Sequence, residues 1–201
     1  MTAFDLLRFR DWTDPVPPAA REVVSLPPDE ERGRPPVLFV PGHRHGAAVF
    51  AEHWLPRTAG RGFPAHALTP RPGGDLRARA HDVVQTAAGL PRQTVLVGHG
   101  TGAAAVAQAL GRYPARAAVL VAPVLGGWRR TVPPRPVGAP PVLVVGSPDD
   151  RVVAGKALDR AAAGYGEAPL MFPGMGHDMM LEDSWAEPID AILDWLEKLV
   201  R

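Results

Sequence analysis

Three glycines at alternate positions give the clearest sign of chemistry in this chain. Gly98, Gly100 and Gly102 follow the β-branched run 94–97 and precede an alanine-rich segment, a pattern that predicts a strand, a very tight turn and a helix. This spacing is that of a nucleophile elbow, G-x-S-x-G, whose central side chain is exposed above a sheet. Here the central residue is Gly100, so the turn offers no serine, cysteine or aspartate for covalent chemistry.

The elements around this turn alternate between short apolar runs and helical segments. We expect strands at residues 21–26, 36–40, 65–68, 94–97, 117–121, 142–145 and 168–172. We expect helices at residues 48–59, 75–88, 101–113, 158–163 and 186–200, with Asp75 as an N-cap. Such alternation indicates right-handed crossovers and a mostly parallel α/β sheet with helices on both faces.

Polar residues follow several of these strands, at the edge where the carboxyl ends of parallel strands meet. The residues in these loops are His43, His45, Asp149, Asp150 and His177. An imidazole can take and give a proton near neutral pH, and a carboxylate can orient it. Asp149 and Asp150 could instead only cap the helix that follows, since Asp is a favoured N-cap.

The histidines at this edge also raise the question of a metal ion. The candidates are His43, His45, His99 and His177. No acidic or cysteine ligand accompanies them at a spacing typical of metal sites, so we predict no metal and no cofactor.

The order of elbow, acid and histidine resembles that of the α/β-hydrolase superfamily, in particular its lysophospholipase-like or esterase-like branch. The resemblance runs from about Pro36 to the C-terminus and includes the segments 61–63 (Arg-Gly-Phe) and 174–178 (Gly-Met-Gly-His-Asp). It implies one domain over residues 1–201, with a doubly wound, mostly parallel sheet of about seven or eight strands. Residues 1–34 would form an N-terminal edge segment.

The resemblance also implies roles for individual residues. His177 would be the catalytic histidine, Asp150 the acid that orients it, and Gly100 stands at the nucleophile position. The backbone N–H groups of Thr101 and His43 would form the oxyanion hole. The side chains that we expect to line the pocket are His99, His45, Met175 and Trp128.

The chain departs from the family pattern in three places. The first loop has Pro41-Gly42 where the family usually has His-Gly, and Gly100 replaces the nucleophile. A proline- and glycine-rich loop, residues 123–140, stands in place of the lid, so we expect little or no cap and a shallow pocket.

Three functions are compatible with these departures. The first is an enzyme that uses a His-Asp dyad and a backbone oxyanion hole for acid–base chemistry on a small carbonyl-containing substrate, either by proton transfer, cyclisation or addition, or by water-mediated hydrolysis. The second is a non-catalytic pseudo-hydrolase that binds a ligand or a protein. The third is a serine esterase that carries a Ser-to-Gly substitution at Gly100.

Composition excludes other classes. The net charge of +1 and the absence of a long basic run argue against a nucleic-acid partner, and the lack of cysteine removes disulfides and thiolate chemistry. No segment has the ~20 apolar residues of a membrane span, and residues 1–10 lack the apolar core of a signal peptide. We therefore expect a cytoplasmic protein with a small-molecule partner, and an open apolar rim is compatible with a homodimer.

Overall fold

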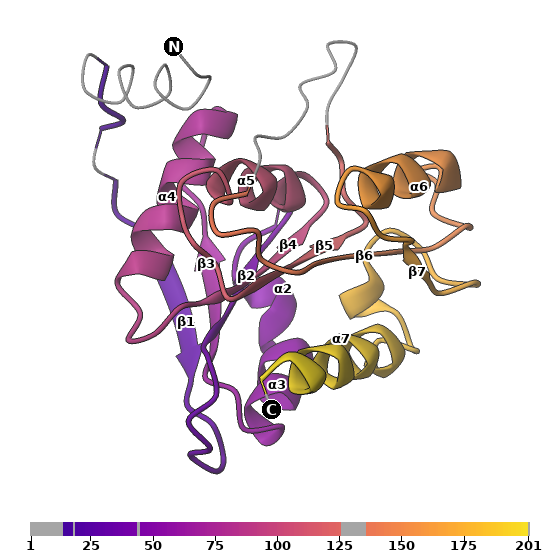
Figure 1. The fold of residues 1–201 in the computed structure, drawn as a ribbon, viewed down its shortest axis with the longest axis horizontal. Helices are drawn as coiled ribbons and strands as arrows, with labels where there is room; N and C mark the ends of the chain where they lie inside the picture. The colour runs from indigo at the N-terminus through magenta and orange to yellow at the C-terminus, as the bar shows by residue number, and fades with distance from the viewer. Residues whose placement is uncertain (1–13, 18, 44, 126–135, 201) are drawn as a thin grey trace.

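The structure, a computed structural model, describes residues 14–17, 19–43, 45–125 and 136–200. It is built on one seven-stranded sheet with the order β1-β3-β2-β4-β5-β6-β7 (Figure 1). The strands are β1 (Glu22–Leu26), β2 (Val37–Val40), β3 (Ala65–Thr69), β4 (Val95–His99), β5 (Ala117–Val121), β6 (Val142–Gly146) and β7 (Leu170–Met171). All neighbours pair in parallel except β1, which is antiparallel to β3, so the predicted mostly parallel sheet is confirmed.

Helices cover both faces of this sheet. The helices are α2 (Ala48–Ala51), α3 (Trp54–Gly60), α4 (Leu76–Ala88), α5 (Thr101–Ala109), α6 (Gly155–Ala163), the short 3-10 helix η1 (Met179–Leu181) and α7 (Ala186–Leu199). In Figure 1, α4, α5 and α6 lie on one face, and α2, α3 and α7 lie on the other. No helix among the described residues is long and apolar enough to cross a membrane.

The central strands are apolar throughout because both of their faces are covered. Along β2, Val37 and Phe39 join the hydrophobic cluster beneath α3 and α7, while Leu38 and Val40 join the cluster beneath α4 and α5. All four side chains are buried. The alternation of side chains along a strand therefore divides the core into two layers, one on each side of the sheet.

Local signals in the sequence predicted most helix boundaries, but three elements differ from the ranges expected for them. Asp75 is the N-cap of α4, as predicted, and its side chain accepts a hydrogen bond from the Ala78 amide at 2.8 Å. The helix expected at 48–59 is two helices, because the chain turns at Glu52 and His53 before Trp54 enters the core. The helix expected at 101–113 ends at Ala109, and the last strand has only two residues.

Ion pairs fasten the C-terminal helix α7 to α3. Arg57 makes a bidentate pair with Asp190, both contacts at 2.7 Å, and Arg61 reaches Asp194 at 2.6 Å and Glu197 at 3.0 Å. Hydrogen bonds from arginines lower the pKa of Glu197 to about 2.

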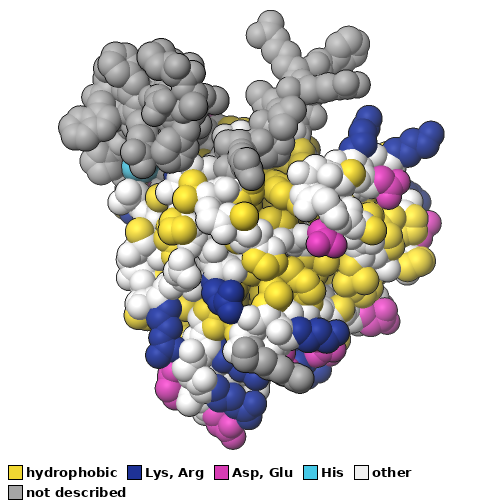
Figure 2. Space-filling model, in the orientation of Figure 1, with side chains coloured by type: hydrophobic (Ala, Val, Ile, Leu, Met, Phe, Trp, Pro, Cys, Tyr) yellow, Lys and Arg dark blue, Asp and Glu magenta, His cyan; other side chains and the backbone are white. Residues whose placement is uncertain are grey.

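Figure 2 shows hydrophobic side chains gathered between α6 and α7 on the face toward the viewer.

Candidate active site

The turn between β4 and α5 has the backbone of a nucleophile elbow. Gly100 adopts φ 56° and ψ −118°, a conformation that costs a side-chain-bearing residue free energy and that glycine adopts readily. The turn is fixed on both sides, because the Gly100 amide donates to the Val121 carbonyl at 2.9 Å and the Val124 amide donates to the Gly100 carbonyl at 3.0 Å. Position 100 is therefore held firmly at the edge of the sheet.

The flanking glycines allow the strand and the helix to approach each other. A Cβ atom at Gly98 would lie 2.6 Å from the Ala103 Cα atom, and one at Gly102 would lie 2.3 Å from the Val40 carbonyl oxygen. Both distances are well inside van der Waals contact with backbone atoms that cannot move aside. The glycine spacing in the sequence is thus required by the packing of α5 against β2 and β4.

A histidine and a carboxylate meet beside this turn. His177 Nδ1 lies 2.8 Å from Asp150 Oδ2, and the Asp150 side chain is fully buried. An ionised carboxylate only accepts hydrogen bonds, so in the neutral imidazole this contact favours the tautomer with the proton on Nδ1 and a lone pair on Nε2. The other oxygen, Oδ1, accepts from the amides of Val152 at 2.6 Å and Val153 at 3.0 Å. Asp150 therefore holds the turn at Val152 and Val153 and also contacts His177. It does not cap the helix that follows, because α6 begins after Ala154 without a side-chain cap.

The free nitrogen of His177 faces the elbow. A Cβ atom built at Gly100 would lie 3.1 Å from His177 Nε2, and the nearest backbone atom, Gly42 Cα, would be 3.7 Å away. The space above Gly100 is thus within hydrogen-bonding distance of an unprotonated imidazole nitrogen.

Two further carboxylates hold the loop that carries His177. Asp149 Oδ2 accepts from the Gly174 amide at 2.7 Å, and Glu182 Oε1 accepts from the Gly176 amide at 3.0 Å. Sequence reasoning missed Glu182, because a glutamate in a loop six positions after Gly176 carries no local signal of this contact. These bonds orient residues 172–178, here called the histidine loop, before any ligand binds.

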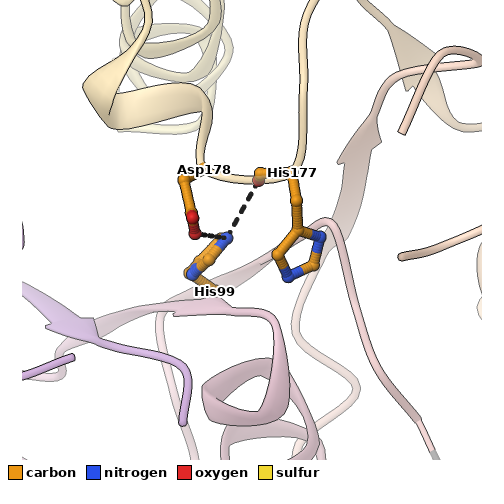
Figure 3. Close-up of side chains that lie close together, drawn as sticks. All are labelled: His99, His177 and Asp178. Carbon is orange, nitrogen blue, oxygen red and sulfur yellow. Dashed lines mark hydrogen bonds and ion pairs between the residues drawn. The ribbon is translucent and has the colours of Figure 1, made fainter. Parts of the chain in front are cut away.

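A second polar cluster adjoins the dyad (Figure 3). His99 Nε2 donates to the His177 carbonyl oxygen at 3.0 Å, and Asp178 Oδ1 lies 3.5 Å from the same nitrogen. His45 Nε2 approaches Asp178 Oδ1 from the other side at 3.4 Å. Burial lowers the pKa of His99 to about 4, so its ring is neutral at pH 7. His99 Nδ1 has no hydrogen-bond partner among the residues that the structure describes.

Comparisons with known proteins identify the fold. No protein-family model and no curated protein matches this sequence. A monoacylglycerol lipase from Paleococcus ferrophilus superposes with a TM-score of 0.73 at 14% identity, over 90% of this chain and 100% of that one. A predicted CIB-like hydrolase from Thermoplasma acidophilum gives 0.70 at 19% identity, over 89% and 93% of the chains. The butyrate-bound esterase Est2 of Thermogutta terrifontis gives 0.68 at 18% identity, over 92% and 91%. The chain has the α/β-hydrolase fold.

The other residues predicted for the site of this α/β-hydrolase fold differ in how deeply they are buried. Thr101 is the first residue of α5, so its amide belongs to the helix turn whose N–H groups have no helical acceptor. His43 is exposed in the loop after β2, and its Nδ1 lies 3.5 Å from Arg79 Nη2. Met175 is buried in the core on the side of α3 and α7. Trp128 lies outside the described residues, as does most of the loop predicted to replace the lid, and a chain of this length fits a minimal cap.

Proposed function

We propose that this chain is an acid–base enzyme that acts on a small carbonyl-containing substrate without forming an acyl-enzyme. One observation carries the proposal: a Cβ atom built at Gly100, the residue at which a hydrolase of this fold has its nucleophile, would lie 3.1 Å from His177 Nε2. Asp150 supports it by fixing the tautomer that leaves this nitrogen free.

The proposed hydrolysis uses a water molecule in the space above Gly100. His177 Nε2 takes a proton from this water as its oxygen attacks the substrate carbonyl carbon. The backbone amides of Thr101 and His43 would hold the oxyanion that forms. The tetrahedral intermediate then collapses, and the imidazolium gives its proton to the leaving group. The charge of Asp150 stabilises the imidazolium between these two steps.

The same geometry supports proton abstraction from a carbon next to a carbonyl. His177 would take that proton, and the same amides would hold the enolate oxygen. A reaction of this kind needs no nucleophile at position 100. Oxyanion stabilisation and binding alone supply about 10³- to 10⁴-fold over water in a triad stripped of its nucleophile.

Two chromogenic probes test these roles: p-nitrophenyl acetate reports water activation, and 5-nitrobenzisoxazole reports proton abstraction. We expect the wild-type rate with at least one probe to fall by about 10²- to 10⁴-fold in His177→Gln and in Asp150→Asn, the range that general base catalysis contributes. The side chain of Asp150→Asn keeps an oxygen that can accept the hydrogen bonds from the amides of the following turn. A lower rate in this variant therefore reports the loss of the carboxylate beside the imidazole.

His53→Gln is the matched control, because the His53 ring stacks on Trp185 with centroids 4.4 Å apart and belongs to no contact of the dyad. Intact-protein mass spectrometry during turnover should show no acetyl adduct. Wild-type protein that is no faster than His177→Gln with either probe would favour a non-catalytic ligand-binding role instead.

A further inference from the structure

The carboxylate of Asp178 lies between two imidazoles at distances that are unusual for hydrogen bonds. Its Oδ1 atom is 3.4 Å from His45 Nε2 and 3.5 Å from His99 Nε2. Strong hydrogen bonds between nitrogen and oxygen span 2.7–3.2 Å, so neither contact is one. Ligand atoms about 2.0–2.1 Å from a tetrahedral Zn²⁺ ion are separated from each other by about 3.3–3.4 Å, which is close to the spacing seen here.

His177 belongs to the same cluster. One ligand atom from each of His99, His177 and Asp178 lies within 4.8 Å of the others, and Figure 3 shows the three side chains side by side. The Asp150 carboxylate already holds His177 Nδ1 at 2.8 Å, which leaves Nε2 available as a ligand. A metal-binding histidine almost always has such a carboxylate or carbonyl on its other nitrogen.

We propose that His99, His177 and Asp178 bind one divalent transition-metal ion, for which Zn²⁺ is the best chemical match. Two imidazoles and one carboxylate are a common ligand set for zinc and leave a coordination position open to water. The sequence did not predict this site, because Asp178 was not recognised as the acidic ligand that the histidines needed.

Binding requires the three ligand atoms, which now lie within 4.8 Å of one another, to close to about 3.3–3.4 Å, and it requires a change of proton at His99. Its Nε2 atom must release a proton, and the hydrogen bond to the His177 carbonyl is lost. His99 Nδ1 has no partner among the described residues, so moving the proton to that nitrogen breaks no other hydrogen bond among them. The ligands come from the end of β4 and from the histidine loop, which the Asp149 and Glu182 contacts already hold in place.

The metal site and the proposed dyad share His177 Nε2. A bound ion therefore removes the free base, and the dyad reaction belongs to the metal-free protein. Metal binding itself does not rest on the proposed function, since it needs ligand atoms and no catalysis. A protein that binds no metal can still pass the dyad tests, so the two proposals fail separately.

The test is calorimetric titration of chelator-stripped protein with ZnCl₂, together with the visible absorption of the Co²⁺-loaded protein. We expect one ion per chain and the absorption of a four-coordinate cobalt site. The zinc affinity of Asp178→Asn should be weaker than that of wild type by about tenfold or more, because loss of a group that contacts only a ligand already costs about 10- to 100-fold. Asp178 is 40% exposed, so this variant should fold, which circular dichroism checks.

The control variant is His66→Gln, because His66 lies on β3 and contacts Ser25. Its zinc affinity should equal that of wild type. The proposal is overturned if wild-type protein takes up no ion, if Asp178→Asn binds as tightly as wild type, or if Co²⁺ absorption indicates only the six-coordinate aqueous ion. The second of these results would indicate an adventitious ion only.

Discussion

Returning a serine to the elbow tests the geometry above Gly100 directly. The backbone at this position has φ 56°, so Gly100→Ser introduces conformational strain of about 1–3 kcal/mol. The new Cβ atom would lie 3.1 Å from His177 Nε2, which the imidazole must relieve by moving a few tenths of an ångström. For a domain of this size, such strain lowers Tm by about 2–12 °C.

The serine hydroxyl would then stand within hydrogen-bonding reach of His177, whose other nitrogen is held by Asp150. We expect Gly100→Ser to hydrolyse p-nitrophenyl acetate with a burst of p-nitrophenol and an acetyl adduct visible by mass spectrometry. The rate should rise at least about tenfold over wild type, because the oxyanion hole and dyad supply part of the catalysis of a complete triad.

Gly100→Ala separates the two effects, since it carries the same strain and the same Cβ atom without a hydroxyl. Its Tm should match that of Gly100→Ser, and it should show no burst. The reasoning is refuted if Gly100→Ser folds and yet gives neither an acetyl adduct nor a gain over Gly100→Ala. That result would mean that His177 Nε2 does not contact the side chain at position 100.

Two predictions concern stability. Arg61 and Arg34 lower the pKa of Glu197 from 4.5 to about 2, so its contribution is present above about pH 4.5 and is lost as the pH falls toward 2. After discounting for solvent screening, we expect about 1 kcal/mol from this group, and urea unfolding of Glu197→Gln should show that much less decline over this window than wild type. Asp75→Ala removes the hydrogen bond to the Ala78 amide, and its unfolding free energy should fall by about 0.5–2 kcal/mol. An unchanged urea midpoint in Asp75→Ala would contradict the N-cap assignment.

The fold was predictable because its signals are local. The glycine spacing 98–102 follows from a backbone approach between neighbouring elements, and the apolar strands follow from burial on both faces. The break between α2 and α3 did have a local signal, because Pro56 cannot donate a hydrogen bond to the Glu52 carbonyl and is tolerated only in the first turn of a helix. What the sequence did not indicate is where α3 packs, since the contacts of Trp54 with Phe39 and Phe50 join separate segments of the chain.

The site was predictable only in part. The residues of the dyad, and His45 and His99 beside them, could be proposed from their order in the chain and their place at this edge, but the contacts of Asp178 could not. These side chains come from three separate segments, and only the conformations of their loops bring them together. A carboxylate next to a histidine in sequence gives no indication of which imidazole it will face.

The strand order also decides when the site exists during synthesis. The strands β2, β4 and β5 occupy the middle of the sheet, whereas β7 forms its edge and is made last. A domain generally folds as a unit, and not strand by strand. A nascent chain that ends before residue 170 lacks β7, α7 and His177, so it can complete neither the sheet nor the proposed dyad. The proposed dyad can therefore form only after the segment 170–199 has joined the rest of the domain.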